Sequence, residues 1–182
     1  MDMNEVQKNF VAVFFKEWEL FLKNGDDASQ PSGEVAASRE APFDAPVKVG
    51  EIRLFAESKE PLVGLVLAED SAEGEGYLVV PISPFTVPAT EQEILIGKRV
   101  YQLWNSFTAP LTSVSKSWIV DTLSAEDMKD VARSLSAVLA HESMPKDLGE
   151  FVGLPIVQMD DPRLDYEKRF DAKHNFSLRT PH

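Results

Sequence analysis

The first apolar pattern in the chain has the period of a helix. Between residues 4 and 23, large apolar side chains recur at every third or fourth position, which places them along one side of a helix: Val6, Phe10, Phe14, Trp18 and Phe21. Lys23 and then Gly25 follow, as is typical of a helix C-terminus. Because such an aromatic face is costly to expose to water, we expect this N-terminal amphipathic helix to dock on the protein's own core or on a second subunit.

A membrane-surface anchor is the alternative for the same helix. Such an anchor needs a polar face dominated by Lys and Arg. Here Lys8 and Lys16 are offset by Glu5, Glu17 and Glu19, so the sequence disfavours it. The chain also lacks a run of about 18 apolar residues and a basic leader, so we expect no membrane span and a cytoplasmic protein.

Residues 25–46 differ from the helical segment in composition. They are rich in Asp, Ala, Ser, Pro and Gly and hold almost no large apolar side chain, Phe43 being the exception. Such a segment cannot offset the entropy of ordering a fixed structure. We predict a linker.

Short apolar runs rich in Val, Ile and Leu come next, bounded by Gly, Pro and acidic turns, and this is the pattern of buried strands. They cover residues 49–55, 62–68, 77–82, 93–96, 99–104 and 118–120. Gly74 and Gly76, in the turn at 70–76, predict a hairpin between the second and third strands. Several short strands with short connections favour a small antiparallel barrel or sandwich over a βαβ sheet, so we predict an α+β fold.

A second helix is predicted at about residues 124–140. Ser124 can cap its first free amides, and Asp127 stands at the capping-box spacing with Asp in place of the usual Glu. Met128 opens an apolar series of helical spacing that runs to about Ala140.

The last forty residues are less regular. Residues 151–157 could add an edge strand, although Gly153 and Pro155 weaken that prediction. A short helix is predicted at 165–174, after Pro162. The organisation we expect is therefore an N-terminal helix (1–24), a linker (25–46), a barrel with its terminal helix (47–142) and a C-terminal extension (143–182).

Composition excludes several kinds of site. The 182 residues contain no cysteine and three histidines, so disulfides, thiolate catalysis and iron–sulfur clusters are excluded, a transition-metal site is disfavoured, and no cofactor is expected. Thirty acidic against eighteen basic side chains give a net charge of -12. Affinity for nucleic acid comes largely from Lys and Arg that neutralise phosphates, so the charge argues against general RNA or DNA binding.

Four segments, in order, carry a family resemblance. They are Gly50-Glu51-Ile52-Arg53 in the first strand, Gly64-Leu65-Val66-Leu67-Ala68 in the second, Val79-Val80-Pro81-Ile82-Ser83 ending the third, and Leu123-Ser124-x-x-Asp127-Met128 in the late helix. Together they resemble the MazF/PemK-like toxin family over roughly residues 47–139. The resemblance implies an SH3-like barrel with a terminal helix, usually a homodimer. In active members it implies a metal-independent endoribonuclease that an antitoxin neutralises.

The resemblance also implies two site residues. A Ser or Thr hydroxyl at the end of the third strand positions the phosphate, and Ser83 matches it. An Arg just before the second strand stabilises charge in the transition state. That Arg is absent, since the stretch reads Glu60-Pro61-Leu62-Val63, and Lys59 is the only base between residues 57 and 75. Arg53 is the candidate substitute, so the catalytic prediction is Ser83 with Arg53, and the missing Arg makes RNA cleavage doubtful.

A second candidate site lies between residues 101 and 118, where aromatic rings alternate with small polar groups. This is the composition of a binding surface for bases, peptides or another subunit, and its candidate residues are Trp104, Asn105, Phe107, Lys116 and Trp118. The alternative is that these rings pack against the N-terminal aromatic helix.

Two classes of function follow. The first is a MazF/PemK-like protein with a toxin–antitoxin-like or regulatory role, a homodimer or a partner of another protein, which cleaves RNA only if Ser83 and Arg53 suffice. The second is a non-catalytic protein-binding module on a small β-barrel. Net charge and the absent Arg favour the second class, whereas the ordered segments favour the first.

Overall fold

The computed structural model describes residues 5–24, 46–55, 62–70 and 76–171. The linker predicted at 25–46, with Phe43, lies almost wholly outside the described residues. The acidic loops at 56–61 and 71–75 and the C-terminal residues 172–182 lie outside them as well.

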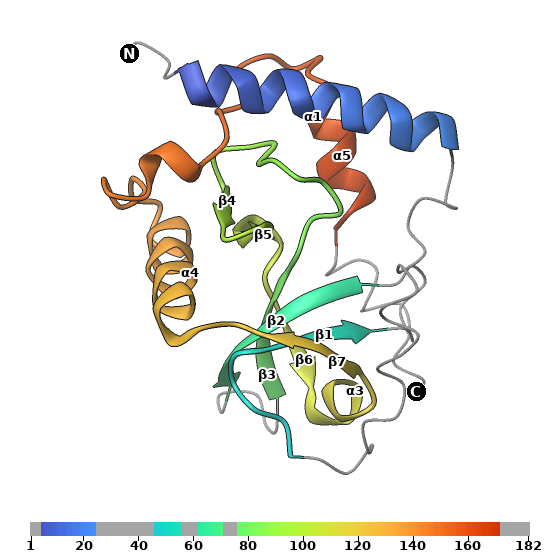
Figure 1. Cartoon of the computed structure of the whole chain (residues 1–182), viewed down its shortest axis with the longest axis vertical. Helices are drawn as coiled ribbons and strands as arrows, with labels where there is room; N and C mark the ends of the chain where they lie inside the picture. Colours follow the sequence, from blue (N-terminus) through green and yellow to red (C-terminus); the bar gives the residue numbers. More distant parts are fainter. Residues whose placement is uncertain (1–4, 25–45, 56–61, 71–75, 172–182) are drawn as a thin grey trace.

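The described chain has an α+β fold, as the pattern of apolar positions predicts (Figure 1). Its helices are α1 (Glu5–Asn24), α3 (Leu111–Ser115), α4 (Ala125–Leu139) and α5 (Arg163–Arg169). Its strands are β1 (Glu51–Phe55), β2 (Leu62–Asp70), β3 (Gly76–Pro81), β4 (Glu93–Ile96), β5 (Arg99–Gln102), β6 (Phe107–Pro110) and β7 (Trp118–Thr122). Two 3-10 turns, η3 (Leu103–Asn105) and η4 (Gly149–Phe151), complete the elements.

Five strands form one antiparallel sheet in the order β6-β3-β2-β1-β7, and β4 pairs with β5 in a separate hairpin. The predicted pairing of the second and third strands is confirmed, because Asp70 lies opposite Gly76 across the turn. Within the described residues β6 and β7 are the two edges of the sheet, and no pairing closes it into a barrel.

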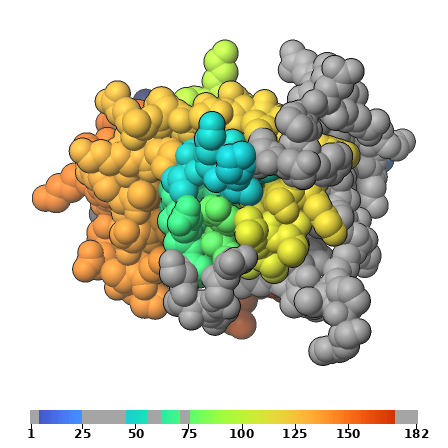
Figure 2. All heavy atoms as spheres, turned by 90° about the horizontal axis from the view of Figure 1, so that it is seen from below, coloured from blue at the N-terminus to red at the C-terminus, as the bar shows by residue number. Residues whose placement is uncertain are grey.

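Strand β1 and the middle of β2 are buried on both faces of the sheet, which explains their continuous apolar runs, whereas the edge strands β6 and β7 hold exposed positions. Alternate side chains point to opposite faces. Ile52, Leu65 and Val80 belong to a core shared with the β4–β5 hairpin and α4, whereas Val66 and Val79 pack with Phe107 and Val114 on the other side. Figure 2 shows the molecule from below, where the cyan segment before β1 (residues 46–49) lies between α4, in orange, and the yellow residues around α3.

A third apolar cluster fixes α1 at the far end of the molecule from the sheet (Figure 1). The predicted aromatic face is confirmed at Phe10, Phe14, Trp18 and Phe21, which are all buried, whereas Val6 is exposed. The rings of Phe14, Trp18 and Phe21 pack against Phe85, and those of Phe14 and Trp18 also against Tyr166 of α5. The helix therefore docks on the protein's own core.

Helix α4 is capped at both ends. At its N-terminus the Ser124 hydroxyl accepts from the Asp127 amide (3.1 Å), which confirms the predicted cap. The Asp127 carboxylate accepts from the Ser124 hydroxyl (2.8 Å), whereas in a capping box it would accept from the Ser124 amide. At its C-terminus His141 adopts a left-handed conformation (φ 55°) and its amide donates to Val138, while the Glu142 amide donates to Ala137. This is the Schellman arrangement, with His at the position that Gly usually occupies.

Ser124→Ala is expected to lower the free energy of unfolding by about 1 kcal/mol, because the Asp127 amide loses its acceptor. Urea unfolding followed by tryptophan fluorescence measures the change. Ser115→Ala is the matched control, since the Ser115 hydroxyl at the end of α3 donates to the Thr112 carbonyl one turn earlier and caps no free amide. An equal loss in both variants would contradict the capping role.

Three local predictions differ from the structure. Residues 107–110 form strand β6, which sequence analysis did not predict, and the run predicted at 99–104 ends in a 3-10 turn. Residues 151–157 make two isolated bridges, Ile94 to Val152 and Thr90 to Leu154, in place of an edge strand. Gly153 lies between these bridges, where a Cβ would come within 2.5 Å of the Thr90 carbonyl oxygen. The segment therefore crosses Thr90 too closely for a regular strand.

No helix in the described part of the chain has the length and apolar content needed to cross a bilayer.

Candidate functional site

Ser83 lies two residues beyond β3 and is 7% exposed. Its amide donates to the Val100 carbonyl (2.8 Å), and its hydroxyl accepts from the Phe85 amide (3.2 Å). The same hydroxyl lies 3.1 Å from the phenolic oxygen of Tyr166. The group proposed to position a phosphate is thus engaged inside the protein.

Arg53 is 2% exposed and belongs to a different network. Its guanidinium donates twice to one oxygen of Glu51, at 2.9 and 2.7 Å. Its Nη1 atom donates to two backbone carbonyls, that of Val114 at 2.9 Å and that of Ser117 at 3.2 Å. Arg53 therefore ties β1 to the segment that joins α3 to β7.

The structure does not bring Ser83 and Arg53 together. Ser83 bonds to α5, beneath α1, whereas Arg53 bonds to the end of α3, on the opposite side of the sheet and at the opposite end of the molecule (Figure 1). No hydrogen bond or ion pair joins the two side chains within the described residues. In this conformation neither offers a free donor to a phosphate.

The five residues of the proposed binding surface do not share one surface. Asn105 and Phe107 are buried, at 1% and 7% exposure, and Phe107 belongs to the core between the sheet and α3. Lys116 is exposed, and Trp118 is half-buried on the edge strand β7. Trp104 is half-buried in the cluster that holds α1, with its ring 6.3 Å from that of Tyr166. The packing alternative considered from the sequence thus holds for Trp104.

A separate buried polar group is Glu93, at the start of β4, which is 0% exposed. Its carboxylate accepts three hydrogen bonds: from the Ala89 amide (2.7 Å), from the Trp104 indole (3.1 Å) and from the Tyr166 hydroxyl (2.5 Å). These donors come from the loop after β3, from η3 and from α5. One carboxylate therefore joins three segments that are distant in sequence.

A chain of side-chain hydrogen bonds leads from Asn105 to Glu93, and the Asn105 amide also donates to the Phe170 carbonyl (2.6 Å). Asn105 donates to the Gln102 side-chain carbonyl (3.0 Å), and the Gln102 amide donates to the Tyr166 oxygen (2.6 Å). The Ser83 hydroxyl, which already accepts from Phe85, can donate to the same oxygen. Tyr166 is then left to donate to Glu93. The network is consistent with an ionised carboxylate at its end.

The three donors that the described residues give this carboxylate are all neutral groups. Burial raises the pKa of Glu93 to about 7, and the three donors lower it only in part. The neighbouring Glu167 raises it further. Burial and the Glu93 charge likewise raise the pKa of Tyr166 well above its usual range. The carboxyl is therefore poised to change charge near neutral pH, a property often found at functional sites and also in structural networks.

Burial indicates that the Glu93 network is structural and is not a substrate site. Its members Glu93, Gln102, Asn105 and Tyr166 are at most 1% exposed, so a substrate has no access to them in this conformation. What the arrangement does is hold the β4–β5 hairpin, η3 and α5 in fixed relation beneath α1. Sequence analysis missed this network, and the one available signal was a glutamate at the head of an apolar strand.

A second buried cation also serves the framework. Arg163 of α5 pairs with Asp161 (2.5 Å) and donates to the Ala89 and Leu154 carbonyls, both at 2.9 Å. It thereby joins α5 to the loop before β4 and to the segment after η4. Metal chemistry has no candidate here, since the described residues contain no group of three His, Asp or Glu side chains placed to hold an ion.

The chain was also compared with known proteins. The MazF/PemK-like resemblance rests on four short sequence segments and stays a prediction. No family model, curated protein or solved structure matches this chain.

Proposed function

We propose that this chain is a cytoplasmic, non-catalytic protein-binding module with a toxin–antitoxin-like or regulatory role, built on a MazF/PemK-like framework. In this proposal the five-stranded sheet, the β4–β5 hairpin and α4 correspond to the SH3-like barrel and terminal helix of that family. The order of the elements supports it, because three antiparallel strands come first and a capped helix follows the last strand directly.

One observation carries the non-catalytic part. Ser83 and Arg53 are both buried, and their polar atoms are engaged by Tyr166 and Phe85 in one case and by Glu51 and backbone carbonyls in the other. Phosphate binding would require breaking these bonds. It would also bring an anion toward a protein with a net charge of -12.

The direct test is incubation of the purified protein with a mixed RNA pool in the absence of divalent metal, beside Ser83→Ala and Arg53→Ala. We expect no cleavage above a buffer control by any of the three proteins. Circular dichroism must show that each variant is folded at the assay temperature. Cleavage by the parent that either substitution reduces at least tenfold would overturn the non-catalytic proposal and restore Ser83 and Arg53 as a site.

The binding part has its own test. We expect the product of a gene next to this one to form a complex of fixed stoichiometry when the two are co-expressed, as an antitoxin does. Light scattering after size-exclusion chromatography measures the mass of the complex. If the chain elutes separately from every neighbouring gene product with which it is co-expressed, the result would count against a toxin–antitoxin-like role.

A further inference from the structure

Tyr166 of α5 lies between the docked helix α1 and the buried carboxylate of Glu93. Its ring packs 5.2 Å from that of Phe14 and 6.0 Å from that of Trp18, both on α1. Its hydroxyl donates to Glu93 (2.5 Å). Tyr166 and Glu93 are both fully buried, and α1 passes across α5 (Figure 1). Helix α1 therefore covers the residue that shields this carboxylate from water.

The charged groups around Glu93 do not neutralise it. On α5, Glu167 repels the Glu93 charge, and Arg163 is paired with Asp161 (2.5 Å). Other charged side chains on the elements packed against β4 are paired or exposed: Arg99 of β5 with Asp121, Arg133 of α4 with Asp147, and Glu150 of η4. Ionised Glu93 is therefore a buried anion that the described residues hold with neutral donors.

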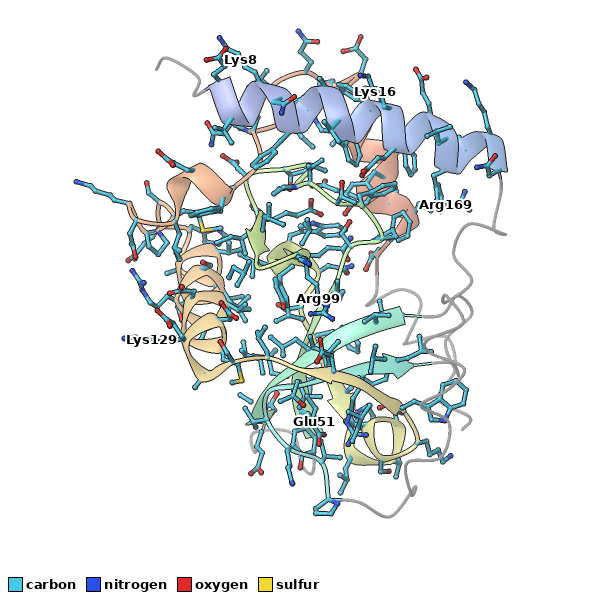
Figure 3. The ribbon with its side chains drawn as sticks, viewed as in Figure 1. Lys8, Lys16, Glu51, Arg99, Lys129 and Arg169 are labelled. Carbon is cyan, nitrogen blue, oxygen red and sulfur yellow. The ribbon has the colours of Figure 1, made fainter. Side chains whose placement is uncertain are left out.

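Helix α1 brings no compensating charge to this site. Its Glu17 carboxylate accepts from the Thr86 amide (2.9 Å). The lysines of α1 are exposed, and those labelled in Figure 3, Lys8 and Lys16, point away from the body. The Arg169 guanidinium of α5 lies 4.9 Å from the centre of the Phe21 ring. Docking of α1 thus removes water from the region of Glu93 without supplying a cation in exchange.

The contacts of α1 are separate from those that hold the sheet together. The rings of Phe14, Trp18 and Phe21 belong to a cluster with Phe85 and Tyr166, whereas the two faces of the sheet belong to two other clusters. Loss of the α1 contacts therefore leaves the strand pairing intact. Elements held in this way open locally, at a lower free energy than unfolding of the whole protein.

We propose that ionisation of Glu93 weakens the docking of α1, so that the interface between α1 and the Phe85–Tyr166 surface is a pH-sensitive switch. When α1 leaves, water reaches Tyr166 and can hydrate the charged carboxylate, which the docked helix keeps dry. Protons therefore favour the docked form. Burial raises the pKa of Glu93 from 4.5 to about 7 in the docked form, so docking weakens as the pH rises through about 7. The switch is independent of the proposed binding role.

Hydrogen exchange of the full chain at pH 5 and pH 8, measured by mass spectrometry of its peptides, tests the switch. Dividing the intrinsic exchange rate at each pH by the observed rate gives a protection factor for α1 and for strand β2. We expect α1 to be at least tenfold less protected than β2 at both pH values, because it opens without unfolding of the sheet. We also expect the protection of α1 to be at least tenfold lower at pH 8 than at pH 5.

Three variants assign the effect to Glu93. Glu93→Gln is expected to reduce the pH-dependent change in α1 protection to less than threefold, because Gln does not titrate. Exposed Glu126→Gln is the matched control and should keep the full change. Glu167→Gln should keep at least a fivefold change, which separates Glu93 from this half-buried neighbour, whose own pKa is raised by burial.

Labelling of a buried thiol gives a second readout that does not require Glu93→Gln to fold. The chain has no natural cysteine, and Ala89 and Ala109 are both buried, Ala89 in the cluster beneath α1 and Ala109 in the cluster beneath α3. Each alkylation rate is divided by that of the same variant in urea at the same pH. We expect Ala89→Cys to react at least tenfold faster at pH 8 than at pH 5, and at least tenfold faster than Ala109→Cys at pH 8.

Three results would overturn the switch. The first is equal protection of α1 and β2, which would mean that α1 is released only by unfolding of the whole protein. The second is a protection of α1 that does not change between pH 5 and pH 8. The third is an unchanged pH dependence in folded Glu93→Gln, which would assign the effect to another group.

Discussion

Between pH 4.5 and pH 8 the wild-type protein is expected to lose about 3 kcal/mol of stability relative to Glu93→Gln. Burial raises the pKa of Glu93 from 4.5 to about 7, so the folded protein holds this proton at pH values where the unfolded chain has released it. The stabilising contribution is fully present below pH 4.5. It is lost as the pH rises through about 7.

The physical cause is the missing cation. Three neutral donors satisfy the Glu93 oxygens, no Lys or Arg of the described segments pairs with the charge, and Glu167 adds repulsion. An isolated charge in a dry interior is costly even when it is hydrogen-bonded. Protonation removes that cost, although all three donors then lose a charged acceptor.

Urea unfolding at several pH values, followed by the fluorescence of the tryptophans, measures the effect. The difference between the parent and Glu93→Gln is the informative quantity, because the Asp residues with lowered pKa, such as Asp121 and Asp147, are common to both proteins. Exposed Glu126→Gln is the matched control and should follow the parent at every pH. Parallel curves for the parent and Glu93→Gln would show that Glu93 does not titrate in this range.

The elements of the fold were largely predictable from sequence, because local periodicity reports which side chains face a core. The apolar spacing from Phe10 to Phe21 predicts a helix regardless of the surface on which that helix packs. Ser124 predicts a helix start because the capping bond that it makes lies within the first turn. Strand β6 was not predictable in the same way. It has four residues, ends in Pro110 and alternates buried with exposed positions only because β3 lies beside it.

The buried polar networks could not be predicted from the sequence either, because they too depend on contacts between residues that are distant in the chain. Glu93 and Tyr166 are 73 residues apart, and no spacing rule relates them. For Arg53 the error is of another kind. Sequence analysis interpreted this charged residue on a strand as an accessible catalytic group, whereas its side chain is buried. Its burial depends on a pairing with Glu51 and on the backbone of the later segment 114–117, which only the three-dimensional arrangement supplies.

Arg53→Met is expected to lower the free energy of unfolding by about 3–5 kcal/mol, because it leaves the Glu51 carboxylate buried without its cation. The side chains of the pair are 3% and 9% exposed, so solvent screens them little. The substitution also leaves the Val114 and Ser117 carbonyls without the guanidinium, while Met keeps much of the buried volume.

The double variant Glu51→Gln/Arg53→Met isolates the charge. We expect it to regain at least about 1 kcal/mol relative to Arg53→Met, since removing both charges also removes the uncompensated carboxylate. Glu51 lies within the sheet in Figure 3, and the Lys48 amide, which donates to its carboxylate at 3.0 Å, can donate to the amide oxygen of Gln instead. Urea unfolding of the parent, the single and the double variants completes the cycle.

The size of this loss also decides how the RNA assay is read. A loss of 3–5 kcal/mol means that Arg53 is a structural residue, because a side chain reserved for a phosphate in solution would contribute little to folding. Activity lost in an Arg53→Ala protein that circular dichroism shows to be unfolded would then say nothing about catalysis, so only the folded variant counts in the RNA assay. A loss below about 1 kcal/mol would contradict the structural role and return Arg53 to the position of a catalytic candidate.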